Sequence, residues 1–264
     1  MSKRLLALRA VIAYVFLDSR AWAAPPDVTF QCSKMPEVCT NMCWAVRCAS
    51  PVFPQTLSWD DPDETTQGRR LASAGCQKSG NKCGAKSKDG VGHRGGRFTS
   101  CDEYPFVSTK ESTLFSNGHQ VSRCVPRSEN ARRRQALKAV YGRWKKQGLG
   151  SHGLAVSFGS PAAEGVNYCT NQPCKNDGFE VQDKQIKKRG QDPVFKFYAA
   201  TSGIVLGSLE QIETPSNFTR LLDNDEATPA HCDSWVERVG GADIRVISDV
   251  LLEELSLDRV LTQA

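Results

Sequence analysis

The sequence lacks the features that mark several common classes of protein. No apolar run outside the N-terminal leader approaches the ~20 residues that cross a bilayer, so we expect a soluble mature chain. The glycine-rich stretch at 90–97 (GVGHRGGR) lacks the spacing and the Gly-Lys-Ser/Thr ending of a phosphate-binding loop. The carboxylates of residues 55–68 do not follow the calcium loop of an EF-hand, and we expect a solvated loop there. The chain also contains no internal repeat.

Zinc-binding patterns are missing as well, although cysteine is abundant. Eleven cysteines follow the leader, and no Cys-x2-Cys or nearby histidine pair completes the tetrahedral set that zinc takes. In an exported chain this number indicates a disulfide framework. Because eleven is odd, at least one thiol stays free or pairs with another chain, and the isolated Cys232 is the candidate. We expect Cys169 and Cys174 to close a small loop, and Cys76 and Cys83 to staple the loop at 75–97.

The first residues have the organisation of a secretory signal peptide. Three basic residues precede a short apolar run at 10–17, and Ala21 and Ala23 occupy the two positions that signal peptidase reads. We expect cleavage near Ala23 and an extracellular mature chain without a membrane anchor. Asp18 and Arg20 lie between the run and the cleavage site, and they leave an uncleaved N-terminal helix as the alternative.

Charge is unevenly distributed along the chain. Removing residues 1–23 takes away four basic residues and one acidic residue, which lowers the formal charge from +5 to +2. Residues 119–147 contain nine lysines and arginines against one acid, whereas residues 209–264 contain twelve acids against four arginines. One part of the surface therefore suits a polyanion, and the C-terminal part does not.

The hydrophobic periodicity predicts a mixed α+β protein. In the middle of the chain it predicts a strand, an Asn-Gly turn at 116–118, a return strand and then a long basic helix. The predicted helices cover residues 37–49, 128–147 and 244–261; the predicted strands cover 98–101, 120–125 and parts of 178–210. Cys39 and Cys43 share one face of the first helix, so each can connect that helix to another segment.

Four polar residues of this middle region could form one site. Asp102 and Glu103 end the first strand, and Glu129 and Asn130 begin the helix. If strand and helix pack together, these side chains can converge on a hard cation such as Mg²⁺ or Mn²⁺. Phosphodiester hydrolysis needs such a cation and a base for water, and basic residues on the same helix could hold the flanking phosphates. The same residues also suit a solvated surface, where Glu129 would simply favour the helix N-terminus.

A motif in this region resembles the signature of the NucA/NucB family of secreted deoxyribonucleases. It comprises residues 100–106 (SCDEYPF), Lys110-Glu111, residues 123–126 (RCVP) and Glu129-Asn130. Residues 35–43 resemble the fungal, cysteine-rich branch of the family, and the whole resemblance covers roughly residues 30–175. It implies a disulfide-stapled, ββα-metal-like nuclease core. The expected organisation is a signal peptide at 1–23, a nuclease-like domain at 24–175 and a small β-rich and helical C-terminal extension at 176–264.

The resemblance also implies roles for individual residues. Asp102 corresponds to the general base, where other ββα-metal nucleases use histidine, and Glu103 is a second catalytic candidate. The implied activity is sequence-nonspecific, metal-dependent cleavage of extracellular DNA by a monomer that binds phosphates. The candidate ligands for one Mg²⁺ or Mn²⁺ are Asn130, Glu129 and Glu111. The candidate DNA-binding residues are Arg123, Arg132, Arg133, Arg134 and Lys138. Asn217 begins an N-glycosylation sequon.

The chain departs from the family pattern at two places. Family members commonly continue past Glu-Asn with small polar residues and glycine, whereas residues 131–135 here are ARRRQ. Ser112 and Thr113 stand where glycines are expected. Both departures fall where metal and DNA would lie, so the alternative is an inactive secreted protein that binds nucleic acid or a host surface. RNA is the alternative substrate, and His93 and His119 are alternative bases.

Overall fold

The computed structural model describes residues 25–87, 90–113, 120–182, 185–186, 193–222, 226–230, 232–239 and 242–262. The predicted signal peptide, the Asn-Gly turn at 116–118 and His119 lie outside these residues. In the part of the chain that is described, no helix is both long enough and apolar enough to cross a membrane.

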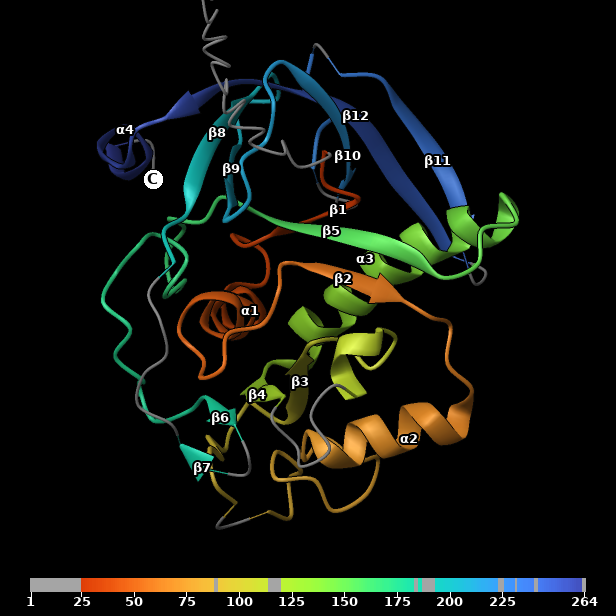
Figure 1. Ribbon diagram of the computed structural model, residues 1–264, viewed down its shortest axis with the longest axis vertical. Helices are drawn as coiled ribbons and strands as arrows, with labels where there is room; N and C mark the ends of the chain where they lie inside the picture. Colours follow the sequence, from red (N-terminus) through yellow and green to blue (C-terminus); the bar gives the residue numbers. More distant parts are fainter. Residues whose placement is uncertain are drawn as a thin grey trace, which may run out of the picture.

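A large, mostly antiparallel sheet forms the upper half of the molecule in Figure 1. Its main order is β1-β5-β9-β8-β12-β10, with β11 paired to β12 and β2 paired to β5. The strands are β1 (Val28–Gln31), β2 (Thr56–Trp59), β5 (His152–Gly159), β8 (Lys196–Ala200), β9 (Val205–Ser208), β10 (Ser216–Leu222), β11 (Ser234–Val239) and β12 (Ala242–Leu255). The parallel pair β1–β5 places Phe30 opposite Phe158, and both side chains are buried in the main core. N-terminal and C-terminal strands therefore share one sheet.

A smaller sheet lies in the lower half, with the order β3-β4-β6-β7. Its strands are β3 (Ser100–Tyr104), β4 (Val121–Val125), β6 (Val181–Gln182) and β7 (Gln185–Ile186). The helices are α1 (Pro36–Arg47), α2 (Glu64–Ser73), the 3-10 turn η1 (Lys110–Thr113), α3 (Arg127–Lys146) and α4 (Leu257–Thr262). The prediction of a mixed α+β protein is confirmed.

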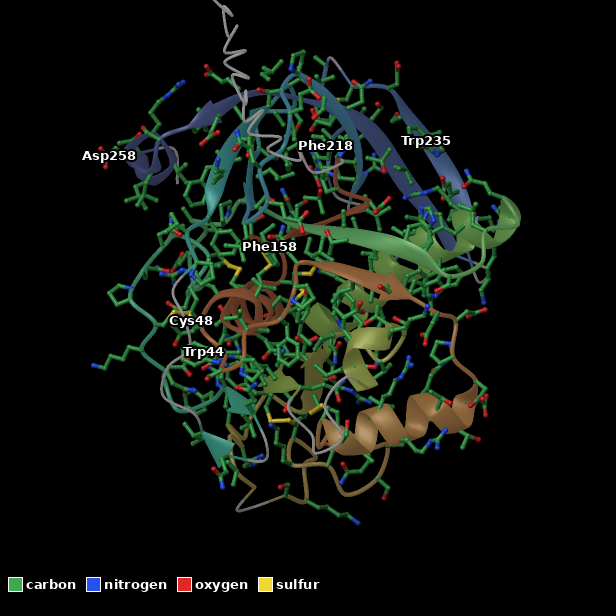
Figure 2. All side chains as sticks on the ribbon, in the orientation of Figure 1. Trp44, Cys48, Phe158, Phe218, Trp235 and Asp258 are labelled. Carbon is green, nitrogen blue, oxygen red and sulfur yellow. A yellow bond between two sulfur atoms is a disulfide. The ribbon has the colours of Figure 1, made fainter. Side chains whose placement is uncertain are left out.

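Helix α1 lies between the two sheets and contacts both β3 and β4 (Figure 1). Met42 and Trp44 have almost no exposed surface and belong to the same core cluster as Phe30 and Phe158, and Figure 2 shows Trp44 and Phe158 in the interior. Burial on almost all sides explains why this helix carries no charge between Glu37 and Arg47. The predicted helix at 37–49 is confirmed, with its start shifted to Pro36, a residue suited to the first helical position.

Five disulfides connect the segments around α1 and the small sheet within the described residues. They are Cys32–Cys39, Cys43–Cys169, Cys48–Cys174, Cys76–Cys101 and Cys83–Cys124. One expected pairing is wrong: Cys169 and Cys174 do not pair with each other but with Cys43 of α1 and with Cys48, which directly follows α1. Cys76 and Cys83 staple the loop at 75–97 as expected, each to a strand of the small sheet. The expectation that Cys39 and Cys43 tie the helix to other segments is confirmed, and Cys232 is the free cysteine.

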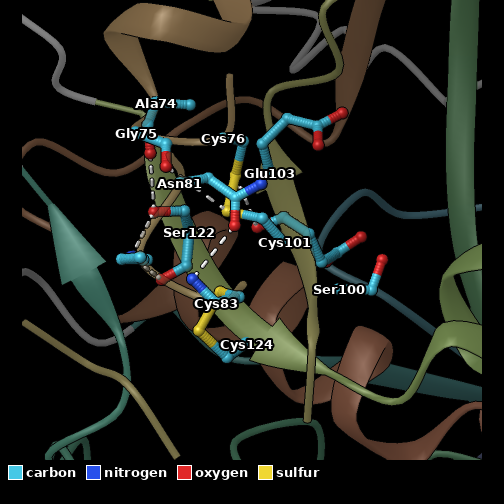
Figure 3. The surroundings of a disulfide bond; sticks show 12 residues. Ala74, Gly75, Cys76, Asn81, Cys83, Ser100, Cys101, Glu103, Ser122 and Cys124 are labelled. Carbon is cyan, nitrogen blue, oxygen red and sulfur yellow. Dashed lines mark hydrogen bonds between the residues drawn. A yellow bond between two sulfur atoms is a disulfide. The ribbon is translucent and has the colours of Figure 1, made fainter. Parts of the chain in front are cut away.

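The two strand disulfides lie side by side on β3 and β4 (Figure 3). Cys101 and Cys124 are directly opposite each other in the antiparallel register. The loop that carries their partners is held further by Asn81, whose side-chain oxygen accepts a hydrogen bond from the Cys83 backbone at 3.0 Å. The first part of the loop at 75–97 is thereby attached at two points to the strand pair β3–β4.

Two secondary-structure predictions are wrong. Residues 55–68, expected to be a solvated loop, contain β2 and the start of α2, where the Asp63 carboxylate accepts a hydrogen bond from the Thr66 backbone at 2.7 Å as an N-cap. Residues 244–261, expected to be an acidic amphipathic helix, form most of β12 and then α4. Strands β8, β10 and β11 all pair with β12, and that pairing outweighs the local helical pattern.

Candidate functional site

The two predicted strands and the basic helix of this region are present as β3, β4 and α3. Strands β3 and β4 are antiparallel, with Asp102 opposite Arg123 and Glu103 opposite Ser122. Pro126 separates β4 from α3, so the helix begins directly at the end of the strand. In its first turn, Asn130 donates hydrogen bonds from Nδ2 to Ser100 Oγ at 2.9 Å and to the Cys101 carbonyl at 2.7 Å. Strand and helix pack together as expected, and Asn130 joins them in the first turn of α3.

Asp102 is the most deeply buried acid of this region, with 0% of its surface exposed. Its Oδ2 accepts a hydrogen bond from Asn41 Nδ2 of α1 at 2.8 Å. Its Oδ1 lies 3.0 Å from Arg133 Nε but accepts no hydrogen bond within the described residues. Burial raises the pKa of Asp102 to about 7, and the nearby Arg133 guanidinium opposes that rise. A carboxylate with this pKa is more basic than an exposed aspartate.

Arg133 is the centre of the polar cluster. Its Nη1 and Nη2 donate to the Glu103 carboxylate at 2.9 and 3.3 Å, and Nη1 also donates to the Glu103 carbonyl at 3.1 Å. Its Nε donates to Asn130 Oδ1 at 3.1 Å, and its guanidinium lies 5.4 Å from the centre of the Phe106 ring. Burial disfavours the charged guanidinium, but Glu103 and Asp102 outweigh that cost and raise the Arg133 pKa. One arginine therefore contacts Asp102, Glu103 and Asn130 together.

Glu129 and Glu111, two of the candidate metal ligands, are bound to backbone groups. Glu129 Oε2 accepts hydrogen bonds from the backbone nitrogens of Glu37 and Val38 at 2.8 and 3.3 Å, which are the first free N–H groups of α1. Burial raises the pKa of Glu129, and these two hydrogen bonds partly oppose the rise. Glu111 Oε2 accepts a hydrogen bond from the Ser58 backbone of β2 at 2.8 Å. Both glutamates therefore fasten neighbouring elements to the site.

The predicted ligands do not fit a divalent cation in this arrangement. The Asn130 side-chain oxygen faces Arg133, and Glu129 and Glu111 point to different elements. Across the residues that the structure describes, no group of three or more His, Cys, Asp or Glu side chains is arranged to hold a metal ion. The orphaned Asp102 Oδ1 is a suitable oxygen donor, but the Arg133 guanidinium lies against it.

The candidate DNA-binding residues separate into interior and surface groups. Arg123 is buried and forms ion pairs with Glu37, Asp177 and Glu180, so it serves an internal network. Arg133 is buried as described above. Arg134 and Lys138 are exposed on α3, and the half-buried Arg132 lines a cavity of about 280 Å³ between α3 and the large sheet. Of the five candidates, Arg132, Arg134 and Lys138 present charge toward solvent or a cavity.

The alternative bases take no part in the described cluster. His93 is half-buried, and its Nδ1 forms a 2.9 Å hydrogen bond with the Lys82 carbonyl. His119 lies outside the described residues. Asn217, the predicted glycosylation site, is exposed on β10 in the other half of the molecule.

Three residues of the site were not found from the sequence. Asn41 positions Asp102, although it lies on a helix whose pattern indicated only core and disulfide positions. Asp177 and Glu180 neutralise Arg123 from a segment more than fifty residues further along the chain. No local signal marks such partners, because their role depends on the return of a distant segment to the hairpin.

The structure thus defines a disulfide-bonded α+β protein with a buried carboxylate centre between a hairpin and a basic helix. Residues 42–149 match the family model described as Deoxyribonuclease NucA/NucB. The match begins within α1, just after Asn41, and ends just after α3, so it includes β3, β4 and the Asp102–Arg133 cluster. This part of the chain is therefore similar to the NucA/NucB family, as the sequence motif predicted. Comparison with curated proteins and with solved structures gave no match.

Proposed function

We propose that the protein is a secreted, sequence-nonspecific endonuclease that hydrolyses phosphodiester bonds of extracellular DNA, with Asp102 as its general base. The observation that carries this proposal is the state of Asp102. The carboxylate occupies the position of the base in the family motif, Asn41 fixes one oxygen, and burial raises the pKa to about 7. A general base works best when its pKa lies near the operating pH, because it is then both ionised and basic enough to take a proton.

In the proposed reaction, a water molecule gives a proton to Asp102 Oδ1, the oxygen that accepts no hydrogen bond. The water oxygen attacks phosphorus, the bond to one ester oxygen breaks, and that oxygen leaves with a proton from solvent. Asp102 has no exposed surface, so substrate and water reach it only after the cluster around it opens. Glu103 is the neighbouring acid whose pairing with Arg133 must change in that opening.

Binding of DNA is proposed to use phosphate contacts from the exposed side of α3. Arg134 and Lys138 are exposed there, and Arg132 lies on the same helix. Contacts of this kind give affinity without reading sequence, and they weaken as salt concentration rises. The disulfide framework is typical of extracellular proteins and supports secretion. The proposal also includes a monomer with Asn217, which is exposed on β10, as the acceptor of an N-linked glycan.

A divalent cation, Mg²⁺ or Mn²⁺, stays part of the proposal as the group that would stabilise charge on the phosphate. Asn130, Glu129 and Glu111 do not fit it in the observed arrangement, so no step is assigned to it. The same observation favours a second function, which is binding of nucleic acid without turnover. Arg133 neutralises the acids that hydrolysis would use, and an inactive binder would retain that pairing permanently.

Nicking of supercoiled plasmid by the oxidised mature protein tests the proposal. The assay compares Mg²⁺, Mn²⁺ and EDTA, and it compares the wild type with Asp102→Asn, which keeps the size of the side chain. Asp258→Asn is the matched control, because Asp258 is exposed on α4, away from the site. Cleavage that only Asp102→Asn abolishes supports the nuclease. Salt-sensitive DNA binding without cleavage by any of the proteins supports the binder. Single-stranded RNA in the same assay tests the alternative substrate.

A further inference from the structure

We propose that Arg133 is a built-in counterion that closes the catalytic centre to divalent cations, because its guanidinium occupies the oxygen atoms that a cation would need. This inference concerns the site of the proposed function and rests on that assignment. It predicts that the wild-type chain takes up Mn²⁺ at this centre only weakly, and that removal of Arg133 opens the centre to the metal.

The oxygen atoms around Arg133 form the kind of set that a hard cation binds. They belong to two carboxylates, one side-chain amide and one backbone carbonyl, and they come from β3 and the start of α3. Mg²⁺ and Mn²⁺ prefer these oxygen types. The guanidinium reaches all of them at 2.9 to 3.3 Å with its planar array of donors. The donor set is therefore present, and Arg133 is its occupant.

The Arg133 guanidinium and a divalent cation cannot occupy the same oxygen atoms together, because both are positively charged. A guanidinium keeps its positive charge at all ordinary pH values, and it repels a divalent ion placed among the same oxygens. Arg133 is 3% exposed, so it cannot turn to solvent without a rearrangement that leaves Asp102 and Glu103 buried without a counterion. Removing one partner of a buried ion pair is strongly unfavourable. Entry of a cation must compete against this pairing.

The helix geometry explains why only one arginine of the ARRRQ run has this role. Asn130 and Arg133 are three residues apart on α3, which places them on one face, and that face meets β3. Arg134 follows on the exposed side. The departure from the family pattern thus introduces a cation into the interior at a single position, where the family resemblance predicted small polar residues.

Mn²⁺ binding to the oxidised, full-length mature protein, followed by the loss of the free Mn²⁺ electron paramagnetic resonance signal, tests this inference. The variants are Arg133→Gln, which removes the charge, and Arg133→Gln with Asp102→Asn, which also removes a donor. Arg127→Gln is the matched control, since Arg127 is an exposed arginine on the same helix. We expect Arg133→Gln to bind one Mn²⁺ on the order of 100-fold more tightly than wild type. Arg127→Gln should behave as wild type, and the double variant should lose the gain.

The unmodified protein keeps the inference falsifiable if Arg133→Gln does not fold. Tight Mn²⁺ binding by the wild type that Asp102→Asn abolishes would overturn it, as would a folded Arg133→Gln with unchanged affinity. Arg133→Lys keeps the positive charge and should remain closed to Mn²⁺. The readout does not involve DNA, so it is separate from the proposed function. If the wild type does not cleave plasmid but Arg133→Gln binds Mn²⁺ more tightly, the proposed nuclease activity is contradicted and this inference is supported.

Discussion

The two halves of the molecule are held together by different means. The half that contains α1, β3, β4 and α3 carries the five disulfides, all between Cys32 and Cys174. In the described part of the C-terminal strands β8 to β12, the single cysteine is Cys232, and it is free. Those strands are held by backbone pairing and by apolar residues such as Phe218 and Leu251. Covalent links are therefore concentrated around the candidate site.

The polar interior of the site explains this distribution. Arg123 and Arg133 are both buried there with carboxylate partners. Removing such charges from water is costly, and their attraction only partly repays the cost. Disulfides reduce the entropy of the unfolded chain and so supply stability that does not depend on apolar packing. The C-terminal strands also bury a charged pair, Arg220 with Asp249, and hold it without a disulfide. The comparison teaches that covalent constraint is placed around the larger cluster of charges at the candidate site, whereas the C-terminal strands rely on strand pairing.

Loss of the two long-range disulfides together should have the largest effect. Cys43–Cys169 and Cys48–Cys174 each span 126 residues and close nearly the same loop, so the unfolded chain is released only when alanine replaces all four cysteines. We expect the free energy of unfolding to fall by about 3–5 kcal/mol. Cys232→Ser, in the other half, should change it by less than about 0.5 kcal/mol. Urea denaturation of both proteins measures the difference, and equal effects would contradict the comparison.

Breaking a buried ion pair in the site should cause the second-largest loss of free energy of unfolding. Glu103→Gln leaves the Arg133 charge with a weaker partner in the interior, and we expect a loss of about 3 kcal/mol. The matched change in the C-terminal half is Asp243→Asn, which breaks the pair with Arg238 on the surface. That pair is 75% and 58% exposed, so its loss should cost less than about 1 kcal/mol. A larger effect from Asp243→Asn in denaturant titrations would reverse the comparison.

Removal of the acid that caps α1 should have a smaller effect. Glu129→Ala frees the two backbone N–H groups of Glu37 and Val38, and we expect a loss of about 1 kcal/mol. Glu129→Gln keeps an oxygen acceptor and should retain much of that stability. Thermal unfolding followed by circular dichroism compares the two variants with wild type. If Glu129→Ala is as stable as the wild type, Glu129 does not stabilise the protein by capping α1.

In the half that contains the candidate site, the contribution of Lys82 to stability should depend on pH. Burial lowers the pKa of Lys82 to about 7, and Glu180 partly opposes this. The folded protein therefore binds fewer protons than the unfolded chain between about pH 7 and the ordinary lysine pKa, and Lys82 contributes stability that rises with pH across this window. Lys82→Met removes this dependence. Its melting temperature relative to wild type should be highest near pH 6 and should fall as the pH rises to 10. A pH-independent difference would refute the assignment.

Much of the candidate site followed from local sequence patterns. The order of two strands and a basic helix, the position of Asp102 and Asn130 on them, and the family match of this region were all predicted, because periodicity and motif spacing are local properties. The ββα-metal core, the roles of the site residues and the domain boundary at 175 stay predictions. The sequence could not indicate Asn41 as the partner of Asp102, since nothing near either residue relates the two segments.

The amino-acid sequence by itself determined the elements of the candidate site, the disulfide-rich character of the chain and the odd cysteine, since each depends on composition or short-range spacing. Only the tertiary structure decided which cysteines pair, because pairing requires Cα atoms close together, as with the 5.2 Å between Cys43 and Cys169. It also decided that residues 242–255 form a strand, because neighbouring strands supply the hydrogen bonds. It decided that Arg133 points inward, because the face of α3 that carries Arg133 packs on β3, where the burial of two acids requires a counterion.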